Sequence, residues 1–223
     1  KNNFFIDLIN TPTPRTVNRR GWLKRSFYGR IQGLFNLILH KKMGEESLKE
    51  FLQKKTNSKQ ELCKKLSFEH GKPLIGLVIN NEVEDSHRSA VERFLEGTCS
   101  LEVEVVVVAD TDLDSFSHPN VHYVPYSEKS RKNIMEASDI MVALPSNDME
   151  EMLMNGVIPI SHKHELINNY NPNSETGNGF VYGNANEVDH WKMFAALIRA
   201  LETYKFPYDW RNIISTGLTS THK

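Results

Sequence analysis

Residues 126–160, YSEKSRKNIMEASDIMVALPSNDMEEMLMNGVIPI, decide the fold that the chain can adopt. The first part spaces its apolar residues as a helix does and predicts a helix over residues 128–137. Asp139 then leads into five apolar residues, 140–144, that end at Pro145. An apolar run of this length between an acid and a proline is typical of a strand that is covered on both faces.

The second part of the stretch adds a shorter helix and another strand. Residues 149–154 predict a helix that ends at Asn155-Gly156, because glycine is the usual residue after a helix C-terminus. The apolar residues 157–160 follow at once. Two apolar strands with one helix between them form a parallel βαβ unit, since a parallel pair needs a crossover connection. Five methionines gather here and are expected to fill the core: Met135, Met141, Met149, Met152 and Met154.

The rest of the chain continues this alternation. The further predicted elements are strands at 74–79, 101–109, 121–124 and 179–183, and helices at 45–52, 58–66, 85–97, 187–201 and from 207 onward. Residues 54–57 are expected to separate the first two helices, with Ser58 and Glu61 forming a capping box, and Asn186 is expected to cap the helix that follows it. The pattern predicts an α/β fold: a Rossmann-like, doubly wound, mainly parallel six-stranded sheet flanked by helices.

The chain divides into three predicted parts. They are a basic, partly helical interdomain segment at 1–56, a Rossmann-like domain at 57–205, and a C-terminal helix and tail at 206–223. In this fold ligands bind beyond the carboxyl ends of the strands. The loops that matter for function therefore begin at Asn80, Asp110, Pro125, Pro145 and Ser161.

The composition is that of a globular protein. Charged residues make up 25% of the chain and hydrophobic residues 39%, which argues against a disordered chain. No apolar run approaches the roughly 20 residues of a transmembrane helix, so we expect no membrane contact. Cys63 and Cys99 have neither a disulfide framework nor a metal-ligand spacing, which favours a reducing, cytoplasmic compartment. The chain starts at Lys1 without a signal-peptide pattern, and we expect it to be part of a longer protein.

Charge is distributed unevenly along the chain. The first 44 residues contain nine Lys and Arg and the single acid Asp7, a net charge of +8, which leaves −9 for the remainder because the whole chain carries −1. Basic residues interleaved with Trp22, Phe27 and Tyr28 can contact nucleic acid. We favour the alternative that this segment packs against the acidic remainder or against another domain.

Short motifs along most of the chain resemble, in the same order, the C-terminal part of bacterial glycogen synthases and plant starch synthases. The matching stretches are Gly29–Ile38, Asn57–Leu66, Pro73–Val78, Tyr126–Glu128, Ala137–Asp139, Leu144–Ser146, Gly156–Ile160 and Gly177–Phe180, followed by Leu201, Tyr204, Pro207, Trp210 and Gly217. The resemblance implies the C-terminal half of a glycosyltransferase-B fold. It also implies transfer of glucose from ADP- or UDP-glucose to an α-1,4-glucan, no cofactor, and an N-terminal domain or a protein partner that completes the site.

The chain departs from the family's pattern at two positions that carry positive charge there. The family places an arginine after the first strand and a lysine five positions later, where both neutralise the departing diphosphate. This sequence has Asn80 and Asp85 at those positions. Because such groups stabilise charge that grows in the transition state, we expect each loss to cost about 3–4 kcal/mol of transition-state stabilisation.

Two loops depart from the pattern as well. After Pro145-Ser146 the family has a longer, glycine-containing loop with a glutamate near the sugar, whereas here only the acids Glu150 and Glu151 remain. The family's glycine pair, which allows close approach to the donor, is replaced by residues 162–165, HKHE. We therefore assign no catalytic residue and expect impaired or absent catalysis.

Some residues stand where the family binds the nucleotide sugar. These candidates are Asn80, Tyr126, Glu128, Ser146, Asn147 and Lys163, the last as a phosphate contact. Ser127 and Glu128 also fit a helix N-terminus, and we favour capping over retained binding. His162 and His164 have a spacing that two metal ligands can have, but no acid or cysteine completes a set, so we expect exposed loop histidines and no metal.

Two functions remain open. The first is a glycosyltransferase-like domain that resembles glycogen or starch synthase and has impaired or absent catalysis. The second is a non-catalytic binding or assembly module built on the same domain. Nucleotide binding separates the two, because a ligand of the native state must raise its stability.

Overall fold

A computed structural model describes residues 46–69, 71–79, 85–110, 118–184 and 188–220. Within the described part, the residues from Glu50 onward form one compact unit. Most of the basic segment, including the motif at Gly29–Ile38, lies outside the described residues.

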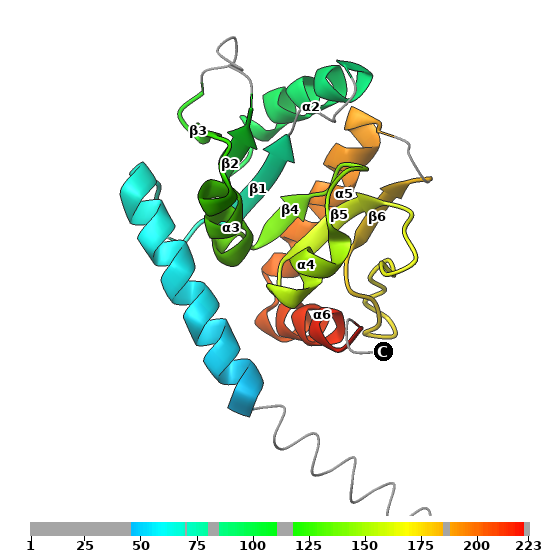
Figure 1. Ribbon diagram of the computed structural model, residues 1–223. Coiled ribbons are helices and arrows are strands. Elements are labelled where there is room, and N and C mark those ends of the chain that lie inside the picture. The colour runs from blue at the N-terminus through cyan, green and yellow to red at the C-terminus, as the bar shows by residue number, and fades with distance from the viewer. Residues whose placement is uncertain (1–45, 70, 80–84, 111–117, 185–187, 221–223) are drawn as a thin grey trace, which may run out of the picture. The chain divides into compact units, whose positions relative to one another are not determined.

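Six strands form one sheet in the order β3-β2-β1-β4-β5-β6 (Figure 1). Their bounds are β1 (Leu74–Ile79), β2 (Glu104–Ala109), β3 (Val121–Pro125), β4 (Ile140–Val142), β5 (Ile158–His162) and β6 (Phe180–Gly183). Every neighbouring pair is parallel. The predicted doubly wound α/β fold is confirmed, and the strand order is the one that reverses direction between β1 and β4.

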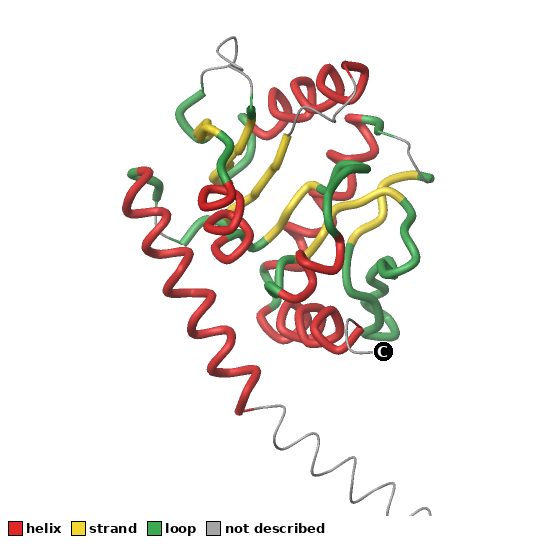
Figure 2. The backbone as a smooth tube through the Cα atoms, in the orientation of Figure 1, coloured by secondary structure: helices red, strands yellow, loops and turns green. Residues whose placement is uncertain are grey.

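Helices cover both faces of this sheet. They are α2 (Asp85–Thr98), α3 (Glu128–Ala137), α4 (Met149–Met154), α5 (His190–Tyr204) and α6 (Pro207–Ser220), preceded by a helix over residues 46–66. α3 and α4 lie on one face, and α2 and α5 lie on the other (Figures 1 and 2). Because both faces are covered, every residue of β1, β2, β4 and β5 is buried.

The predicted βαβ unit is present, with α3, β4, α4 and β5 in the expected order, but several boundaries differ from the prediction. β4 ends at Val142 and not at residue 144, and β5 covers Ile158–His162 and not residues 157–160. The expected strand at 101–109 begins only at Glu104, because Leu101 N donates to Thr98 O (3.0 Å) in the turn that follows α2. Asp189 caps α5 by accepting from Lys192 N (3.0 Å), so the prediction that Asn186 is the cap is wrong.

The helix over residues 46–66 is continuous, so the predicted break at 54–57 and the capping box at Ser58 are wrong. Thr56 Oγ1 donates to Leu52 O (2.8 Å), as a hydroxyl does inside a helix. Lys55 is buried, and its Nζ donates hydrogen bonds to backbone carbonyl oxygens that are distant in sequence. A lysine that the local sequence marks as solvent-facing is therefore held inside by tertiary contacts.

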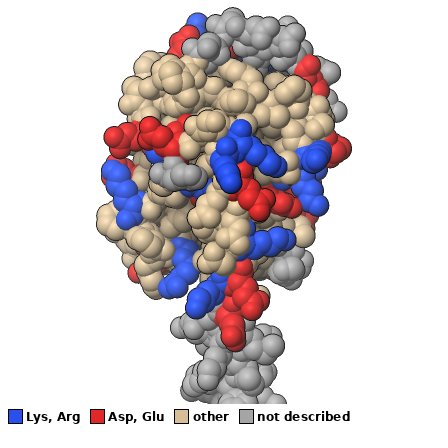
Figure 3. Space-filling model, turned by 90° about the vertical axis from the view of Figure 1, so that its left-hand side faces the viewer, with Lys and Arg blue, Asp and Glu red and all other residues tan. Residues whose placement is uncertain are grey.

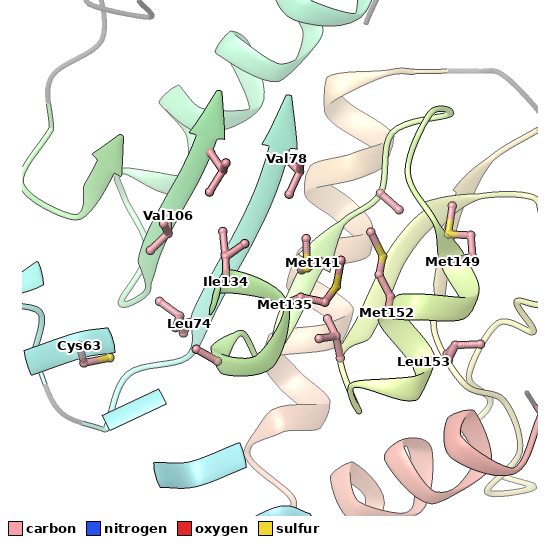
Figure 4. Close-up of a cluster of buried hydrophobic side chains, with 14 of the residues drawn as sticks. Cys63, Leu74, Val78, Val106, Ile134, Met135, Met141, Met149, Met152 and Leu153 are labelled. Atoms are coloured by element: carbon pink, nitrogen blue, oxygen red, sulfur yellow. The ribbon is translucent and has the colours of Figure 1, made fainter. Parts of the chain in front are cut away.

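Four of the five methionines fill the core between the sheet and the layer of α3 and α4 (Figure 4). These are Met135, Met141, Met149 and Met152, and none is more than 3% exposed. The expectation is confirmed for them. Met154 is 53% exposed, so it does not belong to the core.

Two glycines allow segments to approach closely. A Cβ on Gly76 in β1 would lie 2.6 Å from Ser138 Oγ, so the glycine lets the end of α3 pack directly on the strand. Gly156 has φ +61°, and a Cβ there would lie 2.5 Å from the ring of Phe51. The glycine after α4 therefore serves both the left-handed C-terminal turn and the packing of the helix over residues 46–66.

Charged side chains of both signs are interleaved on the face of the molecule that Figure 3 shows. Among the described residues, none of the helices combines the length and the apolar character that crossing a bilayer requires.

Asp139, the first residue before β4, connects the amino ends of several elements. Its Oδ2 accepts from Leu74 N (2.8 Å) and from Lys59 Nζ (2.6 Å), and both charged side chains are less than one-fifth exposed. Lys59 Nζ also donates to Lys72 O (2.7 Å) and lies 3.3 Å from the hydroxyl oxygen of Tyr204. One ion pair thereby ties the helix over residues 46–66 to β1, β4 and α5.

Replacing Asp139 by Asn should lower the free energy of unfolding by about 3 kcal/mol, because the Lys59 charge stays buried without its counter-ion. Urea denaturation measures this loss. Glu202→Gln is the matched control, since it removes a pair with Lys205 whose side chains are 63% and 65% exposed, and it should cost less than about 1 kcal/mol. Equal losses in the two variants would contradict the role given to Asp139.

Candidate functional site

The candidate site is the edge of the sheet where all six parallel strands end. The strand order reverses between β1 and β4, which opens a crevice beyond their carboxyl ends in this class of fold. β1 ends at Ile79, and the predicted site residue Asn80 lies outside the described residues. Asp85, the other departure in that loop, is the first residue of α2.

Asn147 closes the turn between β4 and α4. Its Oδ1 accepts from Leu144 N (2.8 Å), its backbone N donates to Leu144 O (2.9 Å), and its Nδ2 donates to Val78 O (3.4 Å). The side chain therefore fastens the turn to the end of β1. Ser146 lies beside it with its side chain exposed toward solvent.

α4 is short and well defined at its ends. Asp148 Oδ1 accepts from Glu151 N (3.0 Å) at the N-cap, and Asn155 N donates to Glu151 O (3.1 Å) at the C-cap. Tight capping at both ends confines the helix to six residues. A compact turn and the six-residue helix α4 therefore connect β4 to β5.

Ser127 begins α3 as predicted, because its side chain accepts from Ser130 N (3.0 Å) and the Ser130 hydroxyl accepts from Ser127 N (2.8 Å). The capping interpretation of this segment is therefore confirmed. Tyr126 donates its hydroxyl to Glu128 Oε1 (3.0 Å). This bond and the guanidinium of Arg131 lower the pKa of Glu128.

Arg131 joins α3 to α4. Its Nε lies 3.2 Å from Glu128 Oε2, and its NH1 forms a short ion pair with Glu151 on α4. The hydrogen bond that Arg131 donates to Glu151 raises the pKa of Arg131 despite partial burial, so the guanidinium is always charged. Glu151, one of the two acids that remain after Pro145-Ser146, is thus engaged within the protein.

His162 differs from its prediction. It is the last residue of β5 and is only 5% exposed, because pairing with β6 extends the strand two residues beyond the predicted end. Burial lowers the pKa of His162, and repulsion from His164 and His87 adds to this, so the ring is neutral at neutral pH. His162 Nδ1 is buried without a hydrogen-bond partner among the described residues. The expectation of an exposed loop histidine is wrong here.

No group of three or more potential metal ligands occurs in the described part of the chain. The rings of His162 and His164 meet edge to face, with centroids 6.2 Å apart. Lys163 lies between them, and its backbone N donates to Gly183 O (2.8 Å) while its side chain is exposed.

The structure brings only some of the predicted residues together. Tyr126 and Glu128 join one polar chain with Arg131 and Glu151, whereas Asn147 contacts the end of β1 and Lys163 lies at the end of β5. Sequence reasoning missed Arg131. Its spacing of three residues from Glu128 on a predicted helix was a usable signal, but nothing in the sequence pointed to its pairing with Glu151.

Glu151→Gln tests the link between α3 and α4. It should lower the free energy of unfolding by about 1 kcal/mol, because both partners are a quarter to a third exposed and solvent screens the pair. Glu150→Gln, an exposed neighbour, should change it by less than about 0.5 kcal/mol. Thermal denaturation of both variants measures the difference. A Glu151→Gln chain as stable as the parent would show that the ion pair between Arg131 and Glu151 adds nothing to stability.

No protein-family model and no curated protein sequence matches the chain. Solved structures do match it. Starch synthase IV from Arabidopsis thaliana, whose catalytic domain was solved with ADP and acarbose, superposes with a TM-score of 0.60 and 20% identity over 74% of this chain and 38% of that chain. WaaG, a glycosyltransferase involved in lipopolysaccharide biosynthesis, superposes with a TM-score of 0.52 and 16% identity over 73% of this chain and 47% of that chain.

A third match delimits the region that is shared. The C-terminal domain of a glycosyl transferase group 1 family protein, LpcC from Francisella tularensis, gives a TM-score of 0.53 and 14% identity over 75% of this chain and 91% of that chain. The chain thus spans less than half of the starch synthase and WaaG chains but nearly all of this isolated domain. The described residues have the Rossmann-like α/β fold of glycosyltransferase-B proteins.

Proposed function

We propose that the chain is the nucleotide-sugar-binding half of a glycosyltransferase-like protein that resembles glycogen or starch synthase and has impaired or absent glucosyl transfer. The observation that carries this proposal is the parallel sheet whose order reverses between β1 and β4, in a chain that superposes on a starch synthase solved with ADP. ADP- or UDP-glucose is the proposed ligand, beyond the ends of β1, β4 and β5. An α-1,4-glucan and an N-terminal domain or protein partner belong to the same proposal.

Weak catalysis is supported by how the described side chains at this edge are used. Glu151 is paired with Arg131, and the Asn147 amide fastens a turn, so neither is available to a substrate without losing its present contacts. His162 fills space with a buried ring where the resembling family has glycine. Asn80 and Asp85 stand at positions that carry cations in that family.

The second candidate is a binding or assembly module that recognises no nucleotide. The observation that favours it is the same closed chain of contacts, from Tyr126 through Glu128 and Arg131 to Glu151, in which the polar groups satisfy one another. A nucleotide base at this place would have to compete with these contacts. Ligand binding to the chain decides between the candidates.

Thermal unfolding of the 223-residue chain with millimolar ADP, UDP and their glucose derivatives tests the proposal. A ligand at ten times its Kd adds about 1.4 kcal/mol to the free energy of unfolding and should raise the Tm by about 3–6 °C.

Lys163→Ala should reduce this shift in Tm if the exposed ammonium contacts a phosphate. Lys65→Ala, an exposed lysine on the helix over residues 46–66, should leave it unchanged. Unchanged Tm values with all four ligands would reject nucleotide recognition.

Restoring the missing cations should strengthen binding. The double variant Asn80→Arg and Asp85→Lys should bind ADP at least tenfold more tightly, a gain of about 1.4 kcal/mol, because two cations replace a neutral group and an acid near the diphosphate. Asn57→Arg with Glu61→Lys is the matched control, since it adds the same charge at two exposed positions four residues apart. Equal affinity gains, measured by calorimetry, would mean that net charge alone is responsible.

A further inference from the structure

Lys55 is a buried lysine that no part of the candidate site uses. Only 9% of its surface is exposed, and its Nζ donates to Asn155 O (3.0 Å) and Glu136 O (3.4 Å). Asn155 is the C-cap of α4, and Glu136 is in the last turn of α3. Carbonyls at helix C-termini lack partners within their own helix, so the lysine nitrogen serves two helix ends at once.

The carboxylate near Lys55 is already engaged. Asp139 pairs with Lys59, which lies one helical turn after Lys55, whereas the Lys55 nitrogen donates to two neutral carbonyls. Burial is the main cause that lowers the pKa of Lys55, and repulsion from Lys59 acts in the same direction. The attraction of Asp139 and Glu136 opposes this change, and the net pKa is about 8. Near pH 8 the neutral amine of Lys55 is therefore far more populated than that of an ordinary lysine, which is neutral in roughly 0.4% of molecules.

The hydrogen-bond geometry leaves the neutral amine reactive. Both partners of the nitrogen are oxygen acceptors, so the two N–H groups of a neutral amine satisfy them and its lone pair is not consumed by either bond. Lys55 therefore keeps its place in the structure after it loses its proton. An unprotonated lysine with a free lone pair is a nucleophile.

Lys55 and both residues whose carbonyls it contacts line a small hollow. Its volume is about 50 Å³, and it is lined by Phe51, Lys54, Lys55, Ser58, Glu136 and Asn155. A water molecule occupies about 30 Å³ in the liquid, so the hollow has room for a group of a few heavy atoms and excludes large ones. The space suits the carbonyl carbon, oxygen and methyl group of an acetyl unit.

We propose that Lys55 is a site of covalent acylation, at which the side chain accepts a short acyl group from a small activated donor of the thioester class. The amine nitrogen attacks the thioester carbonyl, an N–C bond forms and the C–S bond breaks. The sulfur leaves as a thiol with the proton that the nitrogen releases, and Lys55 becomes a neutral secondary amide. No oxidant or reductant takes part in this exchange.

Two neighbouring lysines on the same helix, Lys54 and Lys59, differ from Lys55 in exposure and in charged partners. Lys54 lines the same hollow but is exposed. For Lys59, burial opposes the charge, yet the attraction and hydrogen bond of Asp139 and Tyr204 raise the pKa, so this amine stays protonated. Of the three lysines on this part of the helix, Lys55 alone combines a lowered pKa with contacts to acceptors only.

The test is acetylation of the native chain by a limiting amount of S-acetyl-N-acetylcysteamine, a small uncharged acetyl thioester. Peptide mass spectrometry gives the initial rate at each lysine. At about pH 7.5 Lys55 should react at least fivefold faster than Lys54, because burial lowers the pKa of Lys55 and the hollow admits the acetyl group. The rate at Lys55 should level off above about pH 9, whereas the rate of an ordinary lysine amine in a model peptide should still rise at about pH 10.

Unfolding and substitution provide the controls. In concentrated urea the two rates should become equal within twofold, since burial and the hollow are lost. Lys55→Arg, which keeps the charge and the donors, should remove the fast-reacting site and leave the rate at Lys54 as it was. A native chain in which Lys55 reacts more slowly than Lys54, or in which its rate rises without levelling off, overturns the proposal.

Discussion

Asp139 connects the amino ends of the central strands through its side chain and its backbone. Its Oδ2 accepts from Leu74 N at the start of β1, its backbone N donates to Leu74 O, and its backbone O accepts from Ile158 N at the start of β5. These three bonds set the register of β4 between its neighbours. Since a strand that slips by one residue turns every side chain to the other face, this register also determines which residues fill the core.

The two edges of the sheet use their polar groups differently. At the amino edge, Lys59 and Asp139 form a mostly buried pair that connects elements distant in sequence. At the carboxyl edge, Asn147 and the contact between Arg131 and Glu151 bind neighbouring turns and helices to one another. The Rossmann-like sheet and its helices are therefore present, while the described polar side chains at the carboxyl edge are largely committed to internal contacts. This combination is the physical basis for proposing binding with weak or absent transfer.

Local sequence predicted those elements whose limits are set by nearby residues. The order of elements in the βαβ unit was predicted correctly because Asp139, Pro145 and Gly156 separate them within the stretch itself, although β4 ends earlier and β5 ends later than predicted. The break at 54–57 was wrong because the burial of Lys55 depends on carbonyls 81 and 100 residues away. The site was predicted less completely, since its contacts join separate helices. His162 belongs to a strand only through its pairing with β6, and Arg131 meets Glu151 across 20 residues.

Lys55 and Lys59 show how the partner, and not burial alone, determines the state of a lysine. The two lie one turn apart on the same helix, and burial disfavours the charge of both. A carboxylate compensates Lys59, whose pKa rises, whereas two helix carbonyls compensate Lys55 only in part, and its pKa falls to about 8. Helix ends carry about half an elementary charge, shared over several carbonyls, which is less than one carboxylate supplies. The amino edge thus holds a lysine with a lowered pKa, away from the carboxyl ends of the strands, so the proposed acylation and the proposed nucleotide binding can be tested separately.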